Sequence, residues 1–418
     1  MIDKDFLKLI WCNRLFGACD LSFSDSVARS VTSLGRATDD DEYRFTGIEL
    51  FDPKSGSVVC GTACFDALSS ELSDTNRDIT LHIVGSRDKV IINGRQEILT
   101  LTITPAPPLG ELYVRMPIDC PQWFASIGPL AREAVIERLV SNRIERKGRE
   151  IIGLVREFDS WSEAFYISFL RSWGYKDKKR DFENLARALP YQYIVRHTHR
   201  EHLVEAMMLG VAGYLDCENP DFYTADLQSE WQAFRHENSI GEPIIDWRSF
   251  HTRPSSAPAI SIVRAATILT RTPNLAREIL DCHTKADLYA LFDVQLPSYW
   301  RYYHAPSTPI RGQAASDTMS VQKLNLVIIN FVVPFIWAYG TANHRDDLIT
   351  RSLDILNLLE GENNMYTRLY FQAGFCVRTA TDSQALIELR TLYCSGGLCA
   401  RCPVGAYRLL LAWRQGVL

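Results

Sequence analysis

Short runs of apolar and β-branched residues, separated by turn-forming residues, fill the first third of the chain. Such runs are typical of strands, and the separators contain Gly, Pro, Asn and Asp, as in DPKSG at 52–56. Five runs predict strands at 45–51, 57–65, 78–85, 97–103 and 111–116. The N-terminal part is therefore expected to form a sheet.

Beyond Cys120 the apolar positions recur with the spacing of a helix. Residues 129–155 place apolar side chains among charges, which predicts an amphipathic helix. Ser160-Trp-Ser-Glu163 has the form of a capping box at the start of the next helix. The change of period near residue 119 predicts an α+β fold: a small mixed α/β domain over 1–118, followed by a larger all-α domain over 119–418.

The longest apolar run, residues 324–340, is interrupted by Asn325, Asn330 and Pro334 and is short for a bilayer span, so we expect a buried core helix and no membrane association. Residues 1–17 have the pattern of a short amphipathic helix and lack the apolar centre of a signal peptide. Eleven cysteines, an odd number scattered over 418 residues, favour a reducing cytoplasm over a disulfide framework.

The formal net charge of −5 argues against a broadly basic nucleic-acid surface. Two local segments, RIERKGR at 143–149 and RSWGYKDKKR at 171–180, carry clustered Lys and Arg, the second with aromatic residues. Nucleic acid, if bound, is expected at these patches. The alternative interpretation of both is a solvated helix face and a loop.

Three cysteines lie close together in LYCSGGLCARCPVG, residues 392–405. Cys399 and Cys402 have the C-x-x-C spacing of a chelating pair, and Cys394 can fold back through the intervening glycines. A four-thiolate centre needs one more ligand, for which Cys120 and Cys376 are the candidates. The alternative is that these cysteines are buried thiols without metal.

The spacing also bears on the kind of metal. A zinc ribbon normally supplies two C-x-x-C pairs, and this chain has one at 399–402. That asymmetry, with the Cys402-Pro403 dipeptide, favours a [4Fe–4S] cluster over zinc.

A second group of metal-binding residue types occurs at His197, His199, His202 and Glu205. It lacks the second histidine of the His-Glu-x-x-His zinc motif, because Glu201-His202 is not followed by one at the required spacing. We expect a polar helix start with Glu205 hydrogen-bonded inside the protein.

Ordered segments along the chain resemble the bacterial family called domain of unknown function 2851. The segments that carry the resemblance include LIWCNRLFG, PIDCPQW, VEAMMLGVAGYL, IINFVVPFIWAYG and TATDSQALIELRTLYCSGGLCARCPVG, and they span nearly the whole chain. The family pattern has cysteines at the positions of Cys120, Cys394, Cys399 and Cys402. The resemblance therefore implies that Cys120 is the fourth ligand.

The N-terminal part of that family resembles the core of PD-(D/E)XK nucleases, with Gly-Pro-Asp-Phe followed by Gly-x-Val-Glu-Ile-His. At the first motif this chain has EYRF (42–45), with Arg44 in place of the Asp; at the second it has GSVVCG (56–61), with Val59 in place of the Glu. The family's Ser-Ser-Asp-Trp is also missing after the second motif. Arg and Val do not bind Mg²⁺. The resemblance thus implies a non-catalytic relative of a nuclease that acts as a binding or assembly module with a structural metal centre.

Two alternatives remain. The chain is an active nuclease if carboxylates from the run at 39–42, together with Asp66 or Asp78, replace the missing ligands. It is a redox or sensor protein if an iron–sulfur cluster at the cysteines is the working part.

Overall fold

The computed structural model describes residues 2–38, 40–72, 78–93, 96–174, 178–238, 240, 247, 257–312, 314 and 316–415. The contacts divide the chain into two compact units. Unit 1 comprises Met1–Val135, Asn364–Cys376 and Leu386–Leu418, and unit 2 comprises Ile136–Asn363 and Val377–Ala385. This grouping differs from a division at residue 118, because C-terminal segments return to the unit that contains the sheet.

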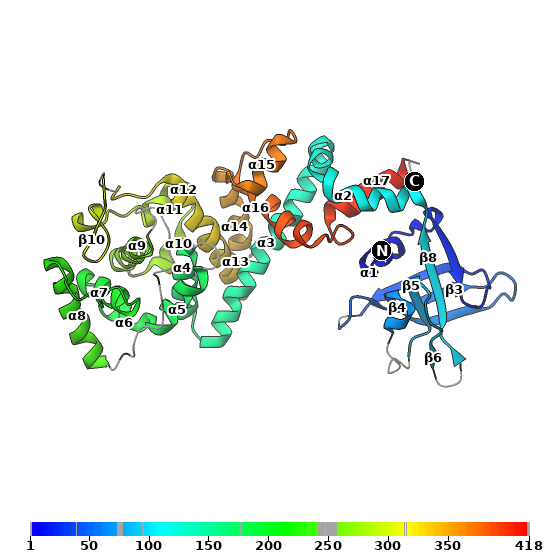
Figure 1. Cartoon of the computed structure of the whole chain (residues 1–418), viewed down its shortest axis with the longest axis horizontal. Coiled ribbons are helices and arrows are strands. Elements are labelled where there is room, and N and C mark those ends of the chain that lie inside the picture. Colours follow the sequence, from blue (N-terminus) through cyan, green and yellow to red (C-terminus); the bar gives the residue numbers. More distant parts are fainter. Residues whose placement is uncertain are drawn as a thin grey trace. The chain divides into compact units, whose positions relative to one another are not determined.

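The N-terminal part of unit 1 is a six-stranded mixed sheet (Figure 1). The strands in spatial order are β1 (Cys19–Phe23), β8 (Leu99–Pro105), β5 (Leu81–Ser86), β4 (Val58–Leu68), β3 (Arg44–Phe51) and β2 (Ser30–Ala37). Neighbours β2, β3 and β4 are antiparallel, β4, β5 and β8 are parallel, and β1 is antiparallel to β8. Two short strands, β6 (Ile92–Asn93) and β7 (Gln96–Glu97), form a separate hairpin.

One face of this sheet is covered by helix α1 (Lys4–Cys12). Asp3 caps the helix by accepting a hydrogen bond from the Phe6 backbone N–H at 2.8 Å. The apolar stripe of α1 packs with the inward-facing side chains of the central strands, and Trp11 and Ile83 are both fully buried in that core. Burial of each large side chain there stabilises the fold by roughly 1.5–3 kcal/mol.

Four of the five predicted strands are confirmed, and the fifth is wrong. Residues 111–116 lie inside helix α2 (Pro107–Ser126). Apolar and β-branched content suggested a strand, but Pro107 and Pro108 occupy the first turn of the helix, where proline fixes the backbone angle without losing a needed N–H. Tyr113 on this helix stacks on Phe6, with ring centroids 4.0 Å apart.

The remaining parts of unit 1 are helical. Helices α15 (Met365–Gln372) and α17 (Pro403–Arg414) both pack on α2. Phe124 of α2 makes edge-on ring contacts with Tyr370 and Phe375. A π-helical turn (Leu389–Tyr393) and a 3₁₀ turn (Cys394–Gly396) precede α17. The end of the chain therefore packs beside α2 within one unit.

Unit 2 is almost entirely helical, as predicted (Figure 1). Helix α3 (Pro129–Phe158) runs from unit 1 into unit 2, and α16 (Ala380–Glu388) also has residues in both. The other helices are α4 (Trp161–Trp173), α5 (Lys178–Ala188), α6 (Tyr191–Arg196), α7 (Glu201–Val211), α8 (Phe222–Asn238), α9 (Pro258–Arg271), α10 (Leu275–Asp281), α11 (Lys285–Phe292), α12 (Val321–Val327), α13 (Val333–Ala342) and α14 (Asp346–Leu358). Strands β9 (Tyr303–Ala305) and β10 (Thr308–Pro309) form a small hairpin.

Two local predictions in unit 2 are tested directly. Ser160 caps α4 by accepting a hydrogen bond from the Glu163 N–H, but Glu163 itself accepts one from the Tyr191 N–H, so its carboxylate serves a second helix instead of completing a capping box. The long apolar run forms a helix over Val321–Ala342 that is long and apolar enough to cross a membrane, and 72% of an apolar 18-residue window within it is buried inside the protein. Its prediction as a core helix is confirmed.

Candidate metal centres

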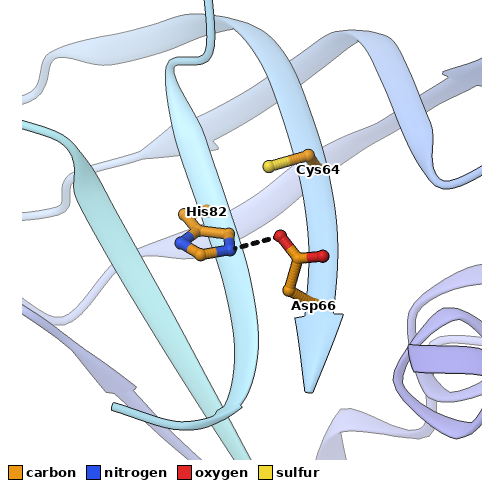
Figure 2. A group of neighbouring side chains, drawn as sticks. All are labelled: Cys64, Asp66 and His82. Atoms are coloured by element: carbon orange, nitrogen blue, oxygen red, sulfur yellow. Dashed lines mark hydrogen bonds and ion pairs between the residues drawn. The ribbon is translucent and has the colours of Figure 1, made fainter. Parts of the chain in front are cut away.

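A cysteine, an aspartate and a histidine converge on the face of the sheet opposite α1 (Figure 2). Cys64 and Asp66 are two residues apart on β4, so both side chains point to the same face. His82 on β5 is the parallel-register partner of Cys64, and its imidazole points toward the Asp66 carboxylate on the neighbouring strand. Their ligand atoms all lie within 4.8 Å of one another.

This Cys64–Asp66–His82 triad is mostly shielded from solvent. The His82 side chain is fully buried, and its Nε2 lies 2.9 Å from the Asp66 Oδ2. Cys64 is buried in a small apolar cluster whose other members are Leu72, Ile79, Ile91 and Ile98. Only the Asp66 carboxylate retains notable exposure, at 21% of its side chain.

The surroundings of Cys64 keep its sulfur protonated when no metal is bound. Burial raises the pKa of the Cys64 thiol far above its ordinary value, and the negative charge of Asp66 raises it further. The Arg44 guanidinium opposes this effect only in part. The thiol is therefore no nucleophile as it stands, whereas a bound cation displaces its proton.

The four cysteines expected to bind metal lie on different elements of unit 1. Cys120 is in the second half of α2, Cys394 begins the 3₁₀ turn, Cys399 follows it, and Cys402 is the N-cap of α17. All four line one cavity of about 20 Å³. Tyr393, Val404, Gly405 and Arg408 complete its wall. Cys376, the alternative fourth ligand, is exposed and is absent from that wall.

Burial dominates the electrostatics of these thiols. It raises the pKa of Cys120 and Cys402 to about 12 and that of Cys399 to about 11, and it also raises the pKa of Cys394. Neighbouring thiols of the group raise the pKa of Cys120, Cys399 and Cys402 further, because charges on adjacent sulfurs repel one another. Such a group binds a cation by exchanging protons for it.

The two groups differ in compactness. Among the residues that the structure describes, the triad is the one group of three whose ligand atoms all lie within 4.8 Å, and the four cysteines do not form such a group. Four sulfurs around one zinc ion, with Zn–S bonds near 2.3 Å, lie about 3.8 Å apart. The four cysteine sulfurs are therefore spaced more widely than a closed zinc site.

The positions expected to replace nuclease ligands are not neighbours in the sheet. Arg44 pairs with Cys64, whereas Val59 pairs with Leu50, five residues or about 17 Å further along β4. Side chains at Arg44 and Val59 therefore do not converge on one point, as two ligands of a single ion must.

Within the described part of the chain, the other acids proposed as relocated ligands form no compact group with Asp66. Asp40 and Asp41 are exposed, and Asp39 lies outside the described residues. Glu42 forms ion pairs with Lys8 and Arg401, at 3.0 and 2.8 Å. Asp78 forms an ion pair with Arg44. Of the candidates for an oxygen ligand, Asp66 alone belongs to the triad, as far as the described residues go.

The histidine cluster near α7 has the structural role that the sequence suggested. Glu205 is buried and accepts hydrogen bonds from the Tyr223 hydroxyl at 2.8 Å and the Trp300 Nε1 at 2.9 Å. His197 contacts the Tyr193 carbonyl through its Nδ1. The prediction that Glu205 is hydrogen-bonded inside the protein is confirmed.

The two basic segments contain many internally engaged residues. Lys147 is half-buried and donates a hydrogen bond to Asn330 at 2.8 Å. Arg171 pairs with Glu150 at 2.9 Å, and residues 175–177 lie outside the described part. Binding of nucleic acid at these segments stays a prediction, and fewer of their Lys and Arg side chains are available to contact phosphate than the sequence suggested.

Sequence reasoning missed the triad as a unit, although it named Asp66 as a possible ligand. The signal was the alternation along β4, which places Cys64 and Asp66 on one face. What the sequence does not reveal is the register that sets His82 opposite Cys64 on a parallel neighbour.

Comparison with known families gives one match, to a family described as "Protein of unknown function (DUF2851)", over residues 71–365. That range includes Cys120 and His82 and leaves out the three C-terminal cysteines. No curated protein and no solved structure matches the chain. Because the matched range covers well over half of its 418 residues, the chain belongs to this family of unknown function.

Proposed function

We propose that the chain is a non-catalytic, metal-containing binding or assembly module, in which Cys120, Cys394, Cys399 and Cys402 hold one structural metal centre. The observation that carries this proposal is the cavity of about 20 Å³ that all four cysteines line. Four protein thiolates leave no coordination position for water, which is the arrangement of a structural site.

The centre links segments that are far apart in the sequence. Cys120 lies in α2, and Cys402 caps α17, which packs on α2. A bridge over nearly 300 residues restricts the unfolded chain, and metal binding that needs the folded arrangement adds to the free energy of unfolding. Loss of metal should therefore destabilise unit 1.

Two features bear on the identity of the metal. The small volume of the cavity suits a single ion such as Zn²⁺. The single C-x-x-C pair followed by Pro403 favours a [4Fe–4S] cluster. Both cofactors belong to the same structural proposal, and metal analysis separates them.

The absence of magnesium-nuclease chemistry is supported by Arg44. This cation stands on β3 directly opposite Cys64 and forms an ion pair with Asp78. Arg44 and Cys64 therefore supply none of the carboxylate oxygens that Mg²⁺ needs at this level of the sheet.

Metal analysis of full-length protein purified anaerobically tests the proposal. We expect about one zinc per chain, or about four irons with broad visible absorption. Cys120→Ser and Cys402→Ser should each lower the metal content and the thermal stability together, whereas the exposed Cys376→Ser should change neither. The proposal fails if Cys376→Ser removes the metal while Cys120→Ser retains it, or if wild-type protein contains none.

An active nuclease with relocated carboxylates is the second candidate, and one observation favours it: Asp66 lies in a group able to bind metal. Mg²⁺- or Mn²⁺-dependent cleavage of DNA or RNA by the wild type, abolished in Asp66→Asn, would establish this function in place of the non-catalytic one.

A further inference from the structure

The geometry of the triad is close to that of a mononuclear metal site. Ligands bound tetrahedrally at 2.0–2.1 Å lie about 3.3 Å from one another. The His82 Nε2 and the Asp66 Oδ2 are 2.9 Å apart, and the Cys64 sulfur is within 4.8 Å of both. Shifts of a few tenths of an ångström at the imidazole and carboxylate, and a larger one at the sulfur, therefore bring all three ligand atoms onto one ion (Figure 2).

The backbone fixes this arrangement before any metal binds. Cys64 and His82 are paired across adjacent parallel strands, and Asp66 is the next residue of β4 on the same face. Side chains placed by strand register lose little further freedom when they bind an ion, so the site is preorganised.

Burial limits the polar partners that the His82 imidazole can reach. Buried imidazoles normally have partners for both ring nitrogens. His82 is fully buried, and its Nδ1 has no hydrogen-bond partner among the described residues. The polar contact of the ring is thus directed toward Asp66, on the side where Cys64 lies.

The donor types select the class of metal. Thiolate and imidazole ligands favour Zn²⁺ and other late first-row ions, whereas Mg²⁺ and Ca²⁺ prefer oxygen ligands alone. One thiolate and one carboxylate also balance the charge of a divalent ion. When the ion binds, the Cys64 proton passes to solvent and a sulfur–metal bond replaces the S–H bond.

We propose that Cys64, Asp66 and His82 bind one Zn²⁺ ion through three protein ligands, with the fourth position open to water. The solvent-accessible edge of Asp66 marks the side from which that position is reached. Three protein ligands and one exchangeable ligand distinguish this site from the closed four-cysteine centre.

Zn²⁺ and Co²⁺ binding to full-length, chelator-treated protein under reducing, anaerobic conditions tests the proposal. Wild type should bind about one equivalent more Zn²⁺ than Cys64→Ala or Asp66→Asn. In each variant the Zn²⁺ affinity of the triad should fall by more than roughly 10- to 100-fold, which is the loss caused by removing an outer hydrogen bond to a metal ligand. The Co²⁺ difference spectrum between wild type and Cys64→Ala should contain a sulfur-to-cobalt charge-transfer band, and azide should shift its visible bands.

A matched control lies on the same strand. Cys60 is exposed and four residues before Cys64 on β4, so Cys60→Ser should leave the extra equivalent and the spectrum unchanged. Metal-free Cys64→Ala and Asp66→Asn should melt cooperatively, which shows that they fold. Equal Zn²⁺ binding by wild type and both folded variants would overturn the site, and insensitivity of the Co²⁺ bands to azide would overturn its open position.

The four-cysteine centre does not enter this proposal. Cys402→Ser should lose the structural centre and keep the equivalent bound by the triad. If Cys402→Ser loses the additional Zn²⁺ ion and Cys64→Ala keeps it, the ion belongs to the four cysteines and the triad site is overturned.

Discussion

Glu205 offers a sharp test of how burial controls protonation in this fold. Glu205 is 2% exposed, and within the described residues its carboxylate accepts hydrogen bonds from the Tyr223 hydroxyl and the Trp300 indole N–H. Burial raises the pKa of Glu205 to about 7, and the two donated hydrogen bonds oppose that effect without cancelling it. Near pH 6 the carboxyl group is therefore mostly protonated in the folded protein and ionised in the unfolded chain.

The sign of the pH dependence follows from this difference. Between about pH 4.5 and pH 7 the folded state binds more protons at this site than the unfolded state, so the free energy of unfolding falls as the pH rises. The pKa difference between 4.5 and about 7, at about 1.4 kcal/mol per pKa unit, gives a loss of about 3 kcal/mol. Glu205→Gln keeps an acceptor oxygen but cannot ionise, so it should lack this loss.

Denaturant unfolding followed by tryptophan fluorescence at pH 4.5, 6 and 8 measures the effect. Relative to wild type, Glu205→Gln should gain about 3 kcal/mol between pH 4.5 and pH 8. Glu218→Gln, at an exposed position beyond the end of α7, is the control and should show no such gain. A difference between Glu205→Gln and wild type that stays constant across this range would refute a raised pKa at Glu205.

Two further predictions concern local packing and helix capping. A Cβ at Gly61 would lie 1.9 Å from the Thr80 Oγ1, so Gly61→Ala should lower the free energy of unfolding by about 1–3 kcal/mol. Adding Thr80→Ala should restore part of that stability, whereas full stability of Gly61→Ala alone in a denaturant titration would contradict the close approach. Ser160→Ala removes the N-cap of α4 and should lower the free energy of unfolding by about 1 kcal/mol. Ser162→Ala, in the exposed first turn, should leave stability unchanged, and equal thermal midpoints for the two variants would argue against the cap.

The sequence predicted elements whose cause is local. Helices α1 and α3 follow from apolar spacing, and the cap at Ser160 follows from one side chain and the N–H three residues later. The strand predicted at 111–116 was wrong for a reason that is also local. The apolar run there resembles a strand, but Pro107 and Pro108 start helix α2 just before it. Strands β1 and β2 were missed because short, half-exposed strands have weak patterns.

Both candidate sites needed information that spacing along the chain does not contain. The three C-terminal cysteines are visible as a group, but their relation to Cys120 depends on α17 packing against α2. The triad is visible only as Cys64 and Asp66 until β4 and β5 are set in register. Pairing of distant segments is decided by the whole core, which is why spacing alone left Cys120 and Cys376 open as the fourth ligand and did not join His82 to Cys64 and Asp66.

Arg44 and the ligand types of the triad both favour Zn²⁺ over Mg²⁺ at this part of the sheet. A Mg²⁺ site of the nuclease kind relies on several carboxylates, and Arg44 occupies the position directly across from Cys64 where a second acid would serve. In the triad, the charges of one thiolate and one carboxylate already balance Zn²⁺, so no further acid is required and the guanidinium can remain paired with Asp78. The same surroundings that exclude a two-carboxylate Mg²⁺ site thus permit a mixed sulfur, nitrogen and oxygen site. On this reasoning Arg44→Asp should strengthen Mg²⁺ binding at the sheet, while the wild type retains its preference for Zn²⁺.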